Sequence, residues 1–137
     1  MLISELELKT RLENFKQVIN KQKLPLTPQK LAIFQSLATT STHPNVQEIY
    51  DRVKEKFSNI SLATVYKNLK KFTDLGLSLE ILIPGEATRY DAKLGAHSHV
   101  VNIESNRVYD LKLPSKLLLS RKIMGKKVKK IQLIYYI

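Results

Sequence analysis

A capped helix with two contrasting faces is the strongest structural signal in this sequence of 137 residues. Ser61 can accept hydrogen bonds from the N–H groups of the first turn, and Gly76 supplies a left-handed stop. Apolar residues recur at helical spacing and predict a buried face: Leu62, Val65, Leu69 and Phe72. The other face offers donors, an aromatic ring and cations: Thr64, Tyr66, Lys67 and Lys70. Such groups contact base edges and phosphates in DNA recognition helices, although a solvated surface helix explains this segment alone equally well.

The flanking segments predict a winged helix-turn-helix. Three helices are expected upstream, over residues 3–20, 28–38 and 45–57, and Thr27-Pro28 gives the second of them a cap and a first residue. Downstream, residues 77–83 and 88–91 flank a Pro84-Gly85 turn and predict a β-hairpin, which would be the wing.

The pattern changes after a hinge-like segment at residues 93–95. Strands are expected over residues 97–103, 108–113 and 128–137, with a turn at 104–106 and a short helix around Leu117–Leu119 after Pro114. The predicted fold class is therefore α+β, with a winged-helix DNA-binding domain over residues 1–92 and a small α/β domain over residues 93–137.

The net charge of +11 favours a polyanionic partner such as nucleic acid. Most of the excess lies in residues 93–137, which hold 10 basic residues against 2 acidic ones. There is no apolar run long enough to span a bilayer and no signal segment, and the sequence has no cysteine. We therefore expect a cytoplasmic protein without disulfides and without a membrane partner.

The three histidines and two of the acids suggest a metal site. His97 and His99 are two residues apart, so on a strand both would point to one face, roughly 7 Å apart. Asp91 precedes them, Asp110 lies on the expected partner strand, and His43 begins a helix. Imidazoles and carboxylates without thiolates suit Fe(II), Mn(II) or Zn(II). An exposed strand with ordinary solvated acids is the alternative.

Taken together, these motifs resemble the ferric uptake regulator family of metal-dependent repressors. The resemblance rests on residues 26–30 (LTPQK), His43-Pro44 followed by Ile49-Tyr50, residues 60–69 (ISLATVYKNL), and Arg89-Tyr90-Asp91 followed by His97-x-His99. It covers the chain from Leu26 to its end. No single motif is specific, but their order is.

The resemblance implies a homodimer that binds double-stranded DNA at two-fold operators and represses transcription. It places His43, Asp91, His97, His99 and Asp110 at the family's regulatory metal positions, between the two domains. Metal binding would favour the closed arrangement that presents both recognition helices to successive major grooves. Tyr66 and Lys67 fall on the DNA-contacting positions, with Thr64 as a further contact.

An aspartate at position 110 resembles the peroxide-sensing branch of the family. There, bound Fe(II) reacts with hydrogen peroxide and oxygen is added to a ligand imidazole, for which His43 and His97 are the expected targets. Mn(II) in the same site would support DNA binding without that reaction. An iron- or manganese-responsive repressor without peroxide sensing is the alternative.

The sequence departs from the family at its structural zinc site. The first Cys-x-x-Cys pair would fall at Asn102 and Ser105, and the second would follow Ile137, so we expect no structural zinc held by four cysteines. The dimer would then rest on strand pairing and apolar packing of these residues: Leu113, Leu117, Leu118, Ile131, Leu133 and Ile134.

Two other functional classes remain as alternatives. A DNA-binding protein with a vestigial histidine cluster would bind without metal. An enzyme using the imidazole–carboxylate site is disfavoured, because five protein ligands leave little open coordination and no catalytic motif is present. We therefore expect a regulator and not an enzyme.

Overall fold

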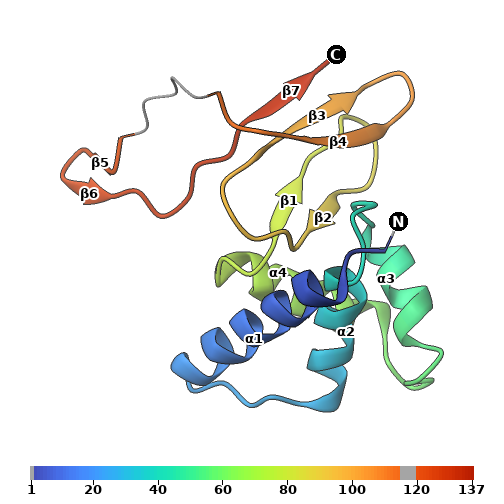
Figure 1. Cartoon of the computed structure of the whole chain (residues 1–137). Helices are drawn as coiled ribbons and strands as arrows, with labels where there is room; N and C mark the ends of the chain where they lie inside the picture. The colour runs from blue at the N-terminus through green and yellow to red at the C-terminus, as the bar shows by residue number, and fades with distance from the viewer. Residues whose placement is uncertain (1, 115–119) are drawn as a thin grey trace. The chain divides into compact units, whose positions relative to one another are not determined.

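The computed structural model describes residues 2–114 and 120–137, and its fold is α+β, as predicted (Figure 1). The chain divides into two compact units, Met1–Leu94 (unit 1) and Gly95–Ile137 (unit 2). None of the helices in the described chain combines the length and the apolar character that a membrane span needs.

Unit 1 begins with four helices, each of which starts at a residue that caps it. They are α1 (Glu5–Lys21), α2 (Pro28–Ala38), α3 (Val46–Val53) and α4 (Leu62–Asp74). The side chains of Ser4, Thr27, Asn45 and Ser61 each accept a hydrogen bond from a first-turn N–H. Because these caps are encoded locally, the helix starts follow the prediction closely. The third helix ends at Val53, earlier than the predicted residue 57.

Three phenylalanines from three helices form the centre of the unit 1 core. The rings of Phe15 (α1) and Phe34 (α2) stack with centroids 4.2 Å apart, and Phe72 (α4) meets both edge-on at 5.4 and 5.5 Å. Val65 and Leu69 are also fully buried, which confirms the predicted inner face of α4. Leu62 is 42% exposed, because it is the first residue of the helix and lies beyond the core.

The wing of unit 1 is a short antiparallel hairpin. Strand β1 (Leu79–Ile81) pairs with β2 (Arg89–Asp91), and Glu80 lies opposite Tyr90. The hairpin continues the chain after α4, so unit 1 is a winged helix. A further bridge joins Arg89 to Asn45, and β2 thereby contacts the start of α3.

Unit 2 is built on a small sheet with the strand order β4-β3-β7. Strand β3 (Ser98–Asn102) pairs antiparallel with β4 (Arg107–Leu111) and parallel with β7 (Ile134–Tyr136). A separate hairpin joins β5 (Lys122–Ile123) and β6 (Lys126–Lys127). The predicted strand over residues 128–137 was too long, since only its last part pairs with β3. The expected helix around Leu117–Leu119 lies outside the described residues.

The turn between β3 and β4 is closed by a side chain. The Asn102 Oδ1 atom accepts hydrogen bonds from the backbone N–H groups of Glu104 and Ser105, both at 3.0 Å. Asn106 then takes a left-handed φ of 57°, which asparagine adopts more readily than most residues. This amide closes the loop at a position where the family resemblance would place a cysteine.

Candidate metal centre and nucleic-acid interface

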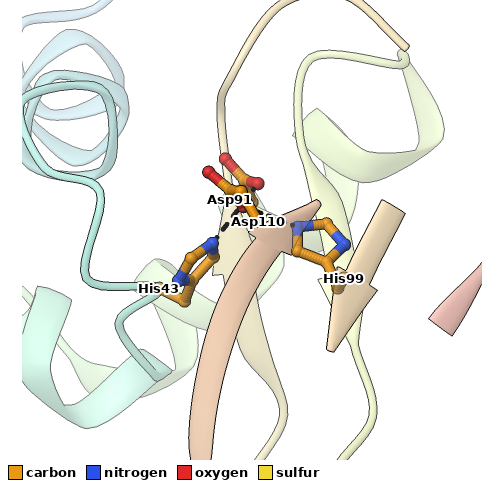
Figure 2. A group of neighbouring side chains, drawn as sticks. All are labelled: His43, Asp91, His99 and Asp110. Carbon is orange, nitrogen blue, oxygen red and sulfur yellow. Dashed lines mark ion pairs between the residues drawn. The ribbon is translucent and has the colours of Figure 1, made fainter. Parts of the chain in front are cut away.

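Unit 1 contains a histidine–aspartate pair assembled from distant parts of the sequence. The Nε2 atom of His43, in the loop before α3, lies 3.6 Å from Oδ2 of Asp91, the last residue of β2 (Figure 2). The second oxygen of Asp91, Oδ1, accepts a hydrogen bond of 2.7 Å from the Lys93 N–H. That bond orients the carboxylate and leaves Oδ2 directed at the imidazole.

Strand β2 also holds the loop that carries His43. The Arg89 guanidinium donates from Nε to the His43 carbonyl and from Nη2 to the Thr42 carbonyl, the latter at 3.1 Å. The Tyr90 N–H donates to the Pro44 carbonyl at 2.9 Å. Three successive carbonyls of the loop are thus bound by one strand, which also ends in Asp91. Both candidate ligands of unit 1 are therefore positioned by β2.

The His43 backbone is in the left-handed region, with a φ of 54°. A side chain with a Cβ takes this conformation at a cost of roughly 1–2 kcal/mol, and such residues persist where their surroundings hold them. Here the hydrogen bonds from Arg89 and Tyr90 hold the loop.

Unit 2 contains a second group, in which one carboxylate faces two imidazoles. Asp110 on β4 lies directly opposite His99 on β3, and its Oδ1 atom is 3.3 Å from His99 Nε2. The same oxygen lies 3.8 Å from His97 Nε2. The two imidazole rings meet edge-on with centroids 4.7 Å apart. The predicted convergence of these three side chains is present within unit 2.

One hydrogen bond sets the tautomer of His97. Its Nδ1 atom lies 3.0 Å from the Gly95 carbonyl oxygen, which can only accept. Nδ1 therefore carries the hydrogen, and the lone pair of the neutral ring is on Nε2, the atom nearer Asp110. A ring N–H bound to a carbonyl is the usual support for a metal-ligating histidine.

The donor chemistry of both groups fits a divalent transition metal. Ligand bonds of about 2.0–2.2 Å place neighbouring donor atoms about 3–3.6 Å apart for angles between a right angle and a trigonal one. Of the distances between imidazole nitrogens and carboxylate oxygens, 3.3 Å lies within that range, 3.6 Å at its upper end and 3.8 Å slightly above it. Each group can therefore close on an ion with small side-chain movements.

The outer face of α4 presents cations and a phenol to solvent. Tyr66, Lys67 and Lys70 are exposed and lie on adjacent positions of the helix surface. Thr64 is only half-exposed, and its hydroxyl lies 2.9 Å from the Ser61 hydroxyl within the N-terminal cap. The structure thus leaves three of the four predicted contact residues available, whereas Thr64 has a structural role in the cap.

The wing lies close to this helix through Tyr90. Burial raises the pKa of Tyr90 to about 12, with further contributions from the Glu80 carboxylate across the hairpin and from Tyr66 on α4. The Tyr90 ring is almost completely buried. Within unit 1, β2 therefore contacts the His43 loop, carries Asp91 and places the Tyr90 ring near Tyr66 on α4.

The predicted residues that the structure brings together within each unit are His43 with Asp91, and His97 and His99 with Asp110. Arg89 is recognisable from the sequence only as part of a motif, and its role in binding the loop carbonyls was not predicted. The only sequence signal for that role was its place beside Asp91 in Arg89-Tyr90-Asp91.

Comparison with known proteins gives a consistent result. The model of the "Ferric uptake regulator family" matches residues 21–136. The chain is 33% identical over 96 residues to the "Peroxide-responsive repressor PerR" of Staphylococcus epidermidis, a match covering 70% of this chain and 64% of the relative. It is 35% identical over 89 residues to the protein of that name from Staphylococcus aureus, covering 65% and 60%. The matches thus span less than two thirds of the length of these relatives.

Solved structures share the fold. The Campylobacter jejuni peroxide stress regulator matches with a TM-score of 0.63 and 30% identity, over 92% of this chain and 93% of that one. The Helicobacter pylori ferric uptake regulator Fur matches with a TM-score of 0.71 over 100% of this chain and 94% of that one, at 17% identity, which shows the fold alone. The family match over most of the sequence is decisive: this chain belongs to the ferric uptake regulator family.

Proposed function

We propose that this protein is a metal-dependent transcriptional repressor that binds two-fold operator DNA as a homodimer and senses hydrogen peroxide. The observation that carries the proposal is the pairing of histidine with aspartate in both units of a winged-helix chain, at 3.6 Å in unit 1 and 3.3 Å in unit 2. The names of the similar Staphylococcus and Campylobacter proteins support the peroxide branch.

One divalent ion would take its ligands from both units: His43, Asp91, His97, His99 and Asp110. Unit 2 alone offers two imidazoles and one carboxylate, a set that can hold Fe(II) with positions left open, and His43 and Asp91 would fill two of those positions. Bound Fe(II) supplies the electrons with which peroxide becomes an oxidant able to add oxygen to an imidazole. Zn(II) fits the same donors without that chemistry.

This chain's own residues connect such a site to DNA binding. β2 carries Asp91, and its Arg89 and Tyr90 hold the His43 loop, so both ligands of unit 1 move with the wing. The DNA contacts would come from Tyr66, Lys67 and Lys70 on α4, which the structure leaves exposed. Loss of the ligands at His43 or His97 by oxidation would then end metal-dependent repression. The function is that of a cytoplasmic regulator and not of an enzyme.

The homodimer is supported by apolar surface on the unit 2 sheet. Large apolar side chains are exposed along β4 and at the end of the chain: Tyr109, Leu111, Ile131, Tyr135, Tyr136 and Ile137. Tyr109 and Tyr135 both lie opposite Val100 and therefore share one face of the sheet, and exposed apolar surface of this kind is typical of protein interfaces. A dimer mass in light scattering of the chromatographed protein would support this assembly, and a monomer at all concentrations would contradict it.

Operator binding is tested first. DNA duplexes selected from a random pool in the presence of Mn(II) should bind the wild-type protein and should be released by a chelator. Lys67→Ala should weaken binding, since a phosphate or base contact is lost, whereas Lys9→Ala on α1 should not.

His97→Ala should abolish the response to metal while the circular dichroism spectrum stays that of the wild type. If neither the chelator nor Lys67→Ala changes the affinity for DNA, the protein binds DNA independently of metal and of this helix, and the proposal is wrong.

Peroxide sensing requires a separate experiment. The protein is loaded anaerobically with Fe(II) or Mn(II), stoichiometric peroxide is added, and peptides are mapped by mass. Oxygen added at His43 or His97 only in the Fe(II) sample supports the proposal. If the histidines stay unmodified in a protein that binds Fe(II), and if DNA is released when Fe(II) is removed, the protein senses iron or manganese instead.

A further inference from the structure

We propose that the β5–β6 hairpin of unit 2 is a second DNA-binding element, which contacts the phosphate backbone independently of sequence and of metal. The inference rests on the proposed function insofar as DNA is the partner. The "basic hairpin" comprises residues 121–130, which include β5, β6 and the turn between them (Figure 1). No part of the proposed metal site or of the α4 surface lies in it.

The basic hairpin concentrates positive charge without compensation. Its ten residues contain six cations and no acid: Arg121, Lys122, Lys126, Lys127, Lys129 and Lys130. All six are exposed. In the part of the chain that the structure describes, no carboxylate pairs with any of them. The acids of unit 2, Glu104 and Asp110, both lie in the β3–β4 hairpin. A charge of this density has a natural partner in a polyanion.

The strand register brings like charges together. Lys122 lies directly opposite Lys127, and Lys126 lies opposite Ile123. Like charges directly across an antiparallel pair destabilise the pairing. The Val128 N–H donates to the Arg121 carbonyl at 2.8 Å and extends the pairing beyond the two strands. The register thus sets Lys122 and Lys127 side by side on one face of the hairpin, and a phosphate between them would remove their repulsion.

The turn of the basic hairpin adds a second unfavourable feature. Met124 and Gly125 have φ values of 53° and 74°, and a type I′ turn requires two such residues, which are usually Asn-Gly. A methionine at this position is 94% exposed, and Ile123 beside it is 57% exposed. Neither solubility nor turn preference accounts for these side chains. An apolar tip on a basic ribbon matches a nucleic-acid groove, which a two-stranded ribbon can enter.

The test is the salt dependence of binding of the full-length protein to a labelled DNA duplex of unrelated sequence, with chelator present. The variant Lys122→Gln/Lys126→Gln/Lys127→Gln is compared with Lys9→Gln/Lys16→Gln/Lys21→Gln, which removes equal charge from α1. Each lost phosphate contact lowers the slope of log K against log salt by about 0.9, so we expect the slope to fall by roughly 2–3 in the hairpin variant only. Circular dichroism confirms that both variants are folded.

The proposal is overturned if the hairpin variant keeps the wild-type slope, or if the α1 variant loses as much. Met124→Asn improves the turn and keeps every cation, so it should retain the wild-type slope, and a slope as low as that of the hairpin variant would contradict binding through the cations. Vesicles containing phosphatidylserine are the competing polyanion, and loss of vesicle binding with unchanged DNA binding would also overturn the proposal.

These outcomes separate the inference from the proposed function. If binding to selected operators depends on metal and on Lys67 while the hairpin variant keeps the wild-type salt slope, only the inference fails. If the unrelated duplex binds through the basic hairpin while Lys67→Ala and metal have no effect, the proposed function fails and the inference stands.

Discussion

Arg89 shows how much of the candidate metal centre depends on a residue that is not itself a candidate ligand. Its guanidinium binds two consecutive loop carbonyls, those of Thr42 and His43, from a strand that ends two residues later in Asp91. The planar group offers several donors in fixed directions, so one side chain can hold both carbonyls. The left-handed His43 backbone is maintained by this contact together with the Tyr90 N–H.

Arg89→Gln should weaken Mn(II) binding by about tenfold or more, the usual effect of losing a residue that orients a ligand. Isothermal titration calorimetry with Mn(II) measures the affinity directly. Arg89→Lys should fall between wild type and Arg89→Gln, because one ammonium group cannot reproduce two divergent donors. Arg107→Gln, at the start of β4, is the matched control. Equal affinities for wild type and Arg89→Gln would show that the loop holds His43 without this guanidinium.

For single residues, the sequence indicates which side chains are candidate ligands but not which residues hold those ligands in place. His43, Asp91, His97, His99 and Asp110 could be nominated because imidazoles and carboxylates are the only strong metal donors that the chain offers. The role of Arg89 could not be predicted, since its acceptors are backbone carbonyls 46 and 47 positions away in the chain. Every residue has a carbonyl, so no pattern of side chains marks these as acceptors.

Among the elements, β2 connects the most features of unit 1. Its backbone pairs with β1, its N–H at Tyr90 holds the His43 loop, and the Tyr90 ring is buried near Tyr66 of α4. A buried phenol opposite the Glu80 carboxylate is stable only while it is neutral. The free energy of unfolding should therefore fall at alkaline pH, and this fall should depend on the Tyr90 hydroxyl.

The unfolded chain loses the Tyr90 proton near pH 10, whereas the folded protein keeps it up to about pH 12. Between these values the folded state binds more protons, so the contribution is complete below pH 10 and is lost as the pH rises towards 12. Relative to Tyr90→Phe, the wild type should lose about 2–3 kcal/mol of unfolding free energy over this range. Urea denaturation in chelator at both ends of the window measures it, with Tyr109→Phe as control. Parallel curves for wild type and Tyr90→Phe would contradict the burial.

The elements also show which structural signals are local. α2 and α4 begin where predicted because the caps Thr27 and Ser61 and the N-terminal Pro28 act within one turn, whereas α1 begins at Glu5, two residues later than predicted. β5 and β6 were missed because their turn contains Met124 in place of the usual asparagine. Alternation over residues 128–137 predicted one long strand, but only Ile134–Tyr136 has a partner in β3. The β3–β7 pairing joins segments far apart in the sequence, so the alternation of residues 128–137 alone does not encode it.

Over the whole molecule, the two units are joined by a short segment that follows Asp91. The Lys93 N–H binds the Asp91 carboxylate, and Lys93 itself is exposed. On the proposed function, an ion held by ligands from both units would restrain this connection, because each unit contributes side chains that the other cannot replace. Metal affinity and the mobility of the connection should therefore be coupled.

Mn(II) should slow tryptic cleavage after Lys93, since a restrained connection enters a protease site less often. Cleavage after Lys9, in exposed α1, provides the internal reference that corrects for any effect of Mn(II) on trypsin. Asp110→Asn, which alters only unit 2, should remove the protection at Lys93. The time course is followed by intact mass. Protection that survives in Asp110→Asn would show that the ion restrains the connection without the Asp110 carboxylate.

The turn closed by Asn102 has a physiological consequence. An amide oxygen that accepts two backbone N–H groups forms as soon as the chain folds, and it needs neither a metal supply nor a reduced thiol. Zinc starvation and disulfide stress would leave the β3–β4 hairpin intact, and with it the strand register that sets His99 opposite Asp110. On the proposed function, the hairpin would therefore keep His99 and Asp110 aligned under the oxidising conditions that the protein has to sense.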